Sequence, residues 1–128
     1  MPPTARLFAV FASLSAALAV ILGAFGAHGL KGRLSAPMLA VYEKAVQYHF
    51  YHALGLFAVA FVAARMPTAS TATWSGWFML AGTVLFSGSL YLLAVTDARW
   101  LGAITPLGGL AFIAAWLLLA WAVFRQQG

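Results

Sequence analysis

The chain has 128 residues, of which 64% are hydrophobic and only 7% are charged. A water-soluble domain normally carries about a quarter charged residues, so this composition excludes an ordinary soluble fold and indicates a protein dissolved in lipid. Its formal net charge is +5, but the Lys and Arg residues stand singly between apolar runs. Basic residues in such places anchor helices at lipid headgroups, so the bilayer is the expected partner and nucleic acid is not.

The first predicted helix covers residues 5–27, and its apolar part is longer than a typical secretory signal core. Small residues recur along it at alternating steps of three and four and therefore share one face: Ala9, Ala12, Ala16, Ala19, Gly23 and Gly26. Such a face lets transmembrane helices approach closely, and this spacing favours a left-handed crossing. We expect the helix to be retained and to lie at the centre of the bundle. Cleavage within residues 24–27 is the alternative.

The second predicted helix covers residues 43–64. At its beginning, several polar side chains run directly into a long apolar segment. Before it, residues 34–41 form a weakly amphipathic segment broken by Pro37, which predicts a short piece lying at the membrane interface. Within the helix, Gly55 is expected to allow close approach by a neighbouring helix.

Two further helices are predicted over residues 74–95 and 100–124, joined by a tight connection at residues 97–99. Pro106 and the glycines after it are expected to break or bend the first turns of the last helix. The alternative is a start at Thr105 as N-cap with Pro106 in the first helical position. A second small-residue face lies on this helix: Gly108, Ala111, Ala115 and Ala122.

Each run is close to the roughly 20 residues that cross a bilayer core. The fold class is therefore all-α: a four-transmembrane-helix bundle, forming one domain over residues 1–128, with both termini on the same side. Basic residues do not decide the orientation, because one side would carry Arg6, Arg65 and Arg125 and the other Lys31, Arg33, Lys44 and Arg99.

Polar side chains gather toward one end of this bundle, where connectivity brings the first and third connections together. A water-accessible polar pocket is expected there, with these candidate binding residues: His28, Tyr48, His49, His52, Ser87 and Tyr91. His49 and His52 differ by about 60° around a helix, so both could face one cleft. Ser89 should point away from Ser87. The residues predicted for helix packing are Ala16, Ala19, Gly23, Gly26, Gly55 and Gly108.

These residue types are compatible with several chemistries. Two histidines three apart on a helix could share a metal or haem, with His28 completing the site, whereas the simpler interpretation is hydrogen bonding between helices. Without cysteine, thiolate sites are excluded. Serine beside glycine resembles no nucleophile elbow, and the spans contain no carboxylate for ion coupling. We expect no enzyme and predict no cofactor; whether a metal binds stays open.

Four blocks of sequence resemble a known family. They are GAFGAHGL at residues 23–30, YHFYHAL at 48–54, FSGSLY at 86–91 and TPLGG at 105–109. In this order they are similar to the YgdD/YwdK-like small bacterial inner-membrane proteins of unknown function. Many relatives have glutamine where His49 stands, which favours His28 and His52 as family-wide functional residues. The resemblance implies a multi-pass inner-membrane protein and favours cytoplasmic termini; it implies no reaction, ligand or catalytic residue.

The leading hypothesis is a non-enzymatic membrane component, acting as a homo-oligomer or as an accessory to a larger membrane complex. The two small-residue faces support it, since they provide more packing surface than one small bundle needs. The rival hypothesis is binding or permeation of a small molecule, an ion, a metal or haem through the polar pocket at the ends of the first three helices.

Overall fold

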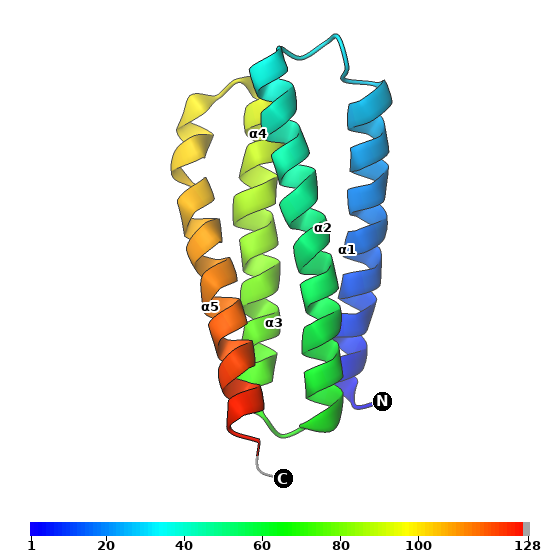
Figure 1. Ribbon diagram of the computed structural model, residues 1–128, viewed down its shortest axis with the longest axis vertical. Coiled ribbons are helices and arrows are strands. Elements are labelled where there is room, and N and C mark those ends of the chain that lie inside the picture. The colour runs from blue at the N-terminus through cyan, green and yellow to red at the C-terminus, as the bar shows by residue number, and fades with distance from the viewer. Residues whose placement is uncertain (127–128) are drawn as a thin grey trace.

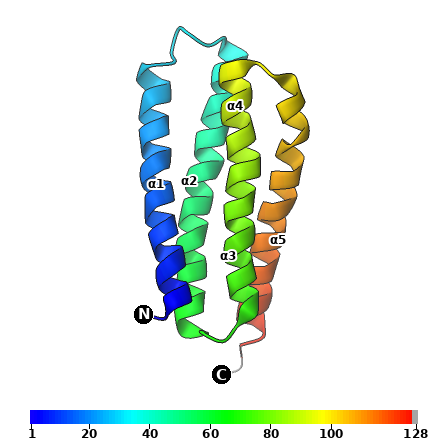
Figure 2. The same ribbon diagram turned by 180° about the vertical axis from the view of Figure 1, so that it is seen from behind.

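Four helical rods lie side by side in the computed structural model, which describes residues 1–126 (Figures 1 and 2). The first two rods are α1, Pro3–His28, and α2, Ala36–Arg65. The third combines α3, Ser70–Gly82, the π-helix η1, Thr83–Gly88, and α4, Ser89–Thr96. The fourth consists of the 3-10 helix η2, Arg99–Ala103, and α5, Thr105–Phe124. All four are long and apolar enough to cross a membrane, so the predicted all-α transmembrane bundle is confirmed.

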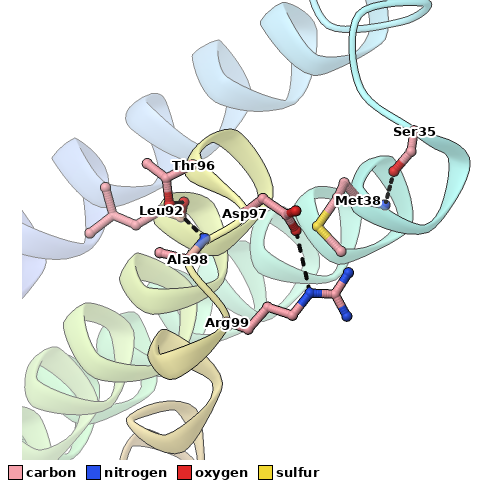
Figure 3. A network of polar contacts seen from close by, with 7 residues as sticks. All are labelled: Ser35, Met38, Leu92, Thr96, Asp97, Ala98 and Arg99. Carbon is pink, nitrogen blue, oxygen red and sulfur yellow. Dashed lines mark hydrogen bonds and ion pairs between the residues drawn. The ribbon is translucent and has the colours of Figure 1, made fainter.

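The second rod begins at Ala36, seven residues before the predicted start at residue 43. The prediction of a separate interfacial segment over residues 34–41 is therefore wrong. Pro37 lies in the first turn, where its missing N–H would have had no partner in any case. Ser35 is the N-cap, and its hydroxyl oxygen accepts the backbone N–H of Met38 at 3.3 Å (Figure 3). Proline here starts a helix instead of breaking one.

The connection after α4 is held by its own polar groups (Figure 3). Asp97 adopts a left-handed backbone with φ of 55°, the conformation that often ends a helix, and its N–H donates to the Leu93 carbonyl. The hydroxyl of Thr96 donates to the Leu92 carbonyl and accepts the N–H of Ala98. Both members of the Arg99–Asp97 ion pair are well exposed, so it adds little stability.

The last rod starts close to the alternative position, because α5 begins at Thr105 with Pro106 in its first turn. The N-cap is Ile104, so the prediction of Thr105 as N-cap is wrong. Before it, η2 carries the chain over the end of the bundle. The bend expected from Pro106 is therefore a junction between two helices and leaves α5 intact.

The central helix is α2, and the prediction that the first helix is central is wrong. In the most apolar 18-residue window of each helix, 44% of residues are buried for α2 and 17% for α1. α1 stands at one edge and packs mainly on α2, while α5 at the other edge packs mainly on α3 and η1 (Figure 1). The small residues of α1 occupy one face only, so this helix makes one close contact and leaves most of its large apolar side chains to lipid, while Phe8 is buried.

Both small-residue faces are used inside the bundle. On α1, Gly26 touches the ring of Tyr42 and Gly23 lies where an added Cβ would be 3.2 Å from Val46. On α5, Gly108 lies directly against the backbone of Phe86. The other predicted packing residues are also in the interior or at its margin: Ala16 is half-buried, Ala19 is buried, and Gly55 lies against Met79 and Trp116. Much of both predicted small-residue faces is therefore in contact with other helices of the same chain.

Candidate functional site

α2 carries two buried histidines near its middle, His49 and His52, which are 4% and 6% exposed. His49 lies between α1 and α4. One ring nitrogen, Nδ1, is 2.9 Å from the hydroxyl oxygen of Tyr91, and the other, Nε2, is 2.9 Å from the hydroxyl oxygen of Ser15. The imidazole therefore bridges two helices that otherwise have little contact.

His52 turns the other way, toward α5. Its Nδ1 lies 2.8 Å from the carbonyl oxygen of Tyr48, so that nitrogen must carry the hydrogen and donate it. Its Nε2 then accepts the indole N–H of Trp116 at 3.1 Å. The ring also stacks on Phe112 with 3.4 Å between centroids. One tautomer satisfies every polar atom of this imidazole.

The serines serve as donors between or along helices. Ser87 donates to the carbonyl oxygen of Ala45 on α2 at 2.8 Å. Ser89 faces the start of α5, where its hydroxyl donates to the Phe86 carbonyl and lies 2.7 Å from the hydroxyl oxygen of Thr105. The expectation that Ser87 and Ser89 point away from each other is confirmed.

The predicted pocket residues do not meet at a single site. Tyr91 joins His49, whereas Tyr48 joins His52 through its carbonyl and a ring stacked at 6.2 Å. His28 is exposed at the end of α1, away from both groups. The prediction that His49 and His52 face one cleft is wrong. On a helix enclosed by three others, an offset of about 60° is enough to direct two side chains into different interfaces.

The geometry does not support a metal shared by His49 and His52, because the two imidazoles lie in different interfaces. All four imidazole nitrogens of His49 and His52 already have hydrogen-bond partners on different helices. Within residues 1–126, no three His, Cys, Asp or Glu side chains are grouped so that they could hold a metal ion.

One hollow near the polar end of the bundle lies between α1 and α2. Gly26 and Ala27 form one wall, and Tyr42, Glu43 and Gln47 form the other. Tyr42 closes its base by donating to the Leu22 carbonyl at 2.5 Å. None of the six predicted binding residues lines this hollow.

A different cleft contains one of the two histidines. It lies between α1 and the η1–α4 part of the third rod, has a volume of about 400 Å³, and is mostly apolar. We call it the α1–α4 cleft; its lining residues are Leu14, Ser15, Leu18, Leu22, His49, Thr83, Val84, Gly88 and Tyr91. His49 is 13 residues from the start of α2, about 20 Å along the helix, so the cleft reaches the middle of the spans.

Ser15, a hydrogen-bond partner of His49 in this cleft, is absent from the predicted binding residues. A signal for it exists, because it lies three residues after Ala12 and four before Ala19, on the small-residue face of α1. A hydroxyl on a face that packs closely against another helix has a polar partner there more often than not. Trp116, the partner of His52, is also absent from the prediction, and nothing in its sequence neighbourhood distinguishes it from the lipid-facing tryptophans.

Comparisons with known proteins extend over nearly the whole chain. A family model described as a protein of unknown function, DUF423, matches residues 22–109. The chain is 52% identical over 120 residues to the UPF0382 membrane protein YwdK of Bacillus subtilis, covering 94% of this chain and 98% of that protein. It is 48% identical over 123 residues to the UPF0382 membrane protein SH2409 of Staphylococcus haemolyticus, covering 96% and 99%. No solved structure matches the chain.

Proposed function

We propose that this chain, which belongs to the DUF423 family of membrane proteins, is a non-enzymatic accessory component of a larger complex in the bacterial inner membrane. The family match confirms the resemblance found in the sequence. The chain is a multi-pass membrane protein, and the names of its relatives state no reaction.

The observation that carries the proposal is the hydrogen bonding of the buried polar groups. Within residues 1–126, every buried side-chain nitrogen and oxygen has a hydrogen-bond partner. Several of these bonds join two helices, as do those of Ser75 to Ala115 and of Ser87 to Ala45. Polar groups in a permeation path must be available to solvate the passing ion or molecule. Groups bonded to one another favour a rigid scaffold that acts through its lateral surfaces.

A hetero-complex is favoured over a homo-oligomer. The surplus small-residue faces that support a homo-oligomer in the sequence are occupied within one chain, as at Gly26 and Gly108. The edge helix α5 instead presents large aromatic side chains on its outer surface, including Trp121 and Phe124. Aromatic residues are enriched at protein interfaces, and here they would contact a different membrane protein.

Extraction at native abundance tests this proposal. Membranes of the source cell are solubilised in mild detergent, the chain carries a small C-terminal tag at its own locus, and the particle is sized and its components are identified. We expect a particle that contains a second membrane protein in fixed proportion. A tagged monomer alone contradicts the proposal, and a particle built only from this 13.6 kDa chain replaces it with the homo-oligomer.

The proposed orientation has cytoplasmic termini. The absence of cysteine allows single cysteines at Ser35 and Ser70, exposed residues at opposite ends of the bundle, to be labelled without background. In intact cells a membrane-impermeant thiol reagent should label Ser35→Cys at once and Ser70→Cys only after permeabilisation. The reverse order would place the termini outside.

A further inference from the structure

Ser15, His49 and Tyr91 form a chain with more hydrogens than hydrogen bonds. A neutral imidazole carries one N–H, and each hydroxyl carries one O–H, which makes three hydrogens. Only two hydrogen bonds join the three side chains. One hydrogen is therefore left over, whichever tautomer His49 adopts.

The unused hydrogen is on a hydroxyl in both arrangements. If Tyr91 donates to Nδ1, then Nε2–H donates to Ser15, and the O–H of Ser15 is unused. If Ser15 donates to Nε2, then Nδ1–H donates to Tyr91, and the O–H of Tyr91 is unused. Within residues 1–126, neither hydroxyl has another hydrogen-bond partner. An imidazole tautomer change thus moves the available donor from one wall of the α1–α4 cleft to the other.

The cleft around this donor has room for a ligand. Ser15 and Tyr91 are partly exposed on its walls, while His49 between them is buried. A Cβ added at Gly88 would meet no atom within 4 Å, although Gly88 lines the cleft. The π-helix Thr83–Gly88 forms part of the wall, and π-helical turns frequently occur at functional sites.

We propose that the α1–α4 cleft binds a lipid-soluble carbonyl compound of the quinone class, whose carbonyl oxygen accepts the unused hydroxyl hydrogen of Ser15 or Tyr91. The apolar walls suit an uncharged ring or tail. The ligand must supply a hydrogen-bond acceptor, because the three linked side chains offer one unused donor. This inference does not depend on the proposed partner complex.

Depth distinguishes this ligand from a membrane phospholipid, which also contains carbonyl groups. Half of a bilayer core is about 15 Å thick, and phospholipid ester carbonyls lie at its boundary. His49 lies near the middle of α2, about 20 Å from its start and about 24 Å from its end, far from both boundaries. A small uncharged carbonyl compound can reach this depth. A phospholipid cannot, because placing its ester group here would put its headgroup in the hydrocarbon core.

Binding of decylubiquinone to the full chain in phosphatidylcholine nanodiscs tests the proposal. Infrared difference spectra should show a quinone carbonyl band shifted to lower wavenumber by the hydrogen bond. In the double variant Ser15→Ala with Tyr91→Phe, we expect about tenfold weaker binding, or about 1.4 kcal/mol, and loss of the shifted band. The matched control is Ser13→Ala with Tyr51→Phe, which removes one serine hydroxyl and one tyrosine hydroxyl outside this cleft. It should bind decylubiquinone as the original chain does.

Three results overturn the proposal: no binding above that of empty nanodiscs, equal binding by the original chain and the double variant, or a shift of the phospholipid ester band in place of the quinone band. If the double variant does not fold, Gly88→Leu gives a second test. A Cβ added at Gly88 would meet no atom within 4 Å and Gly88 lines the cleft, so we expect a leucine side chain to occupy part of the cleft. Binding should then be lost, and undiminished binding contradicts the proposal.

Discussion

His49 and His52 are three residues apart on the same helix and have opposite environments. His52 lies in a closed interface, where Tyr48, Phe112 and Trp116 surround it and one tautomer satisfies both nitrogens. His49 lies at the base of a cleft, and its hydrogen-bond chain retains an unused donor. The difference arises from the neighbouring helices: α5 packs closely on its side, whereas α1 stands apart from α4 at the edge of the bundle.

This comparison assigns different roles to two residues of one type. The closed side contributes to stability, because each partner there would be left unpaired if the other were removed. The open side contributes less to stability and is available for binding. Four substitutions test whether the two sides differ in this way.

His52→Ala should lower the free energy of unfolding by about 3 kcal/mol, because it leaves a cavity beside Phe112 and an unpaired indole N–H on Trp116. The measurement is reversible unfolding by increasing sodium dodecyl sulfate in mixed micelles. His49→Ala is the matched variant and should cost clearly less, since the cleft can accommodate both released hydroxyls. Equal losses for the two variants would remove the distinction between the sides.

Trp116→Phe should cost about 1.5 kcal/mol, because it removes the donor to His52 Nε2 but keeps an aromatic ring. The same micelle titration measures it. Trp74→Phe serves as the control, since Trp74 is 59% exposed at the beginning of the third rod and should tolerate the change. A loss at Trp74 as large as that at Trp116 would show that ring size, and not the hydrogen bond, determines the effect.

Ser15→Ala should cost only about 0.6 kcal/mol, the average of hydrogen bonds between transmembrane helices. The tautomer of His49 can adjust so that its bond to Tyr91 is kept. Ser13→Ala, which removes a hydroxyl bonded only to its own helix, provides the baseline. A cost above about 2 kcal/mol would mean that the Ser15 hydrogen bond holds α1 in place, and that the open side contributes as much to stability as the closed one.

Gly88→Ala should leave stability unchanged or raise it by about 0.5 kcal/mol, because its Cβ enters open space and alanine restricts the unfolded chain. Gly82→Ala is the counterpart on the closed side, where the new Cβ would run into the ring of Phe112. We expect that variant to be destabilised in the same titration. If both alanines behave alike, the cleft is not open at Gly88.

The sequence was sufficient for the architecture, because long apolar runs and their connections predict four spans. The polar residues of α2 remain candidates for binding. The direction in which each histidine points was not predictable, because it depends on the order of the helices. The small-residue face of α1 indicates close packing, but a single such face is compatible with a central helix or with a peripheral one.

The start of α2 shows a different limit. Ser35 followed by Pro37 has the pattern of a helix beginning, but proline within an apolar stretch is also read as a break. The partner of His52 could not be predicted, since Trp116 is separated from it by 64 residues and resembles the other tryptophans in sequence. Ser15 could have been predicted as a polar contact, because its spacing places it on the packed face of α1.

Nitrogen-15 resonance of the histidine rings in phosphatidylcholine nanodiscs tests most directly whether one side is closed and the other open. His52 should show a single tautomer with hydrogen on Nδ1, unchanged when decylubiquinone is added. His49 should shift on that addition, and the exposed His28 serves as the internal reference. If His49 and His52 both stay unchanged, or both shift alike, the assignment of a closed and an open side is contradicted.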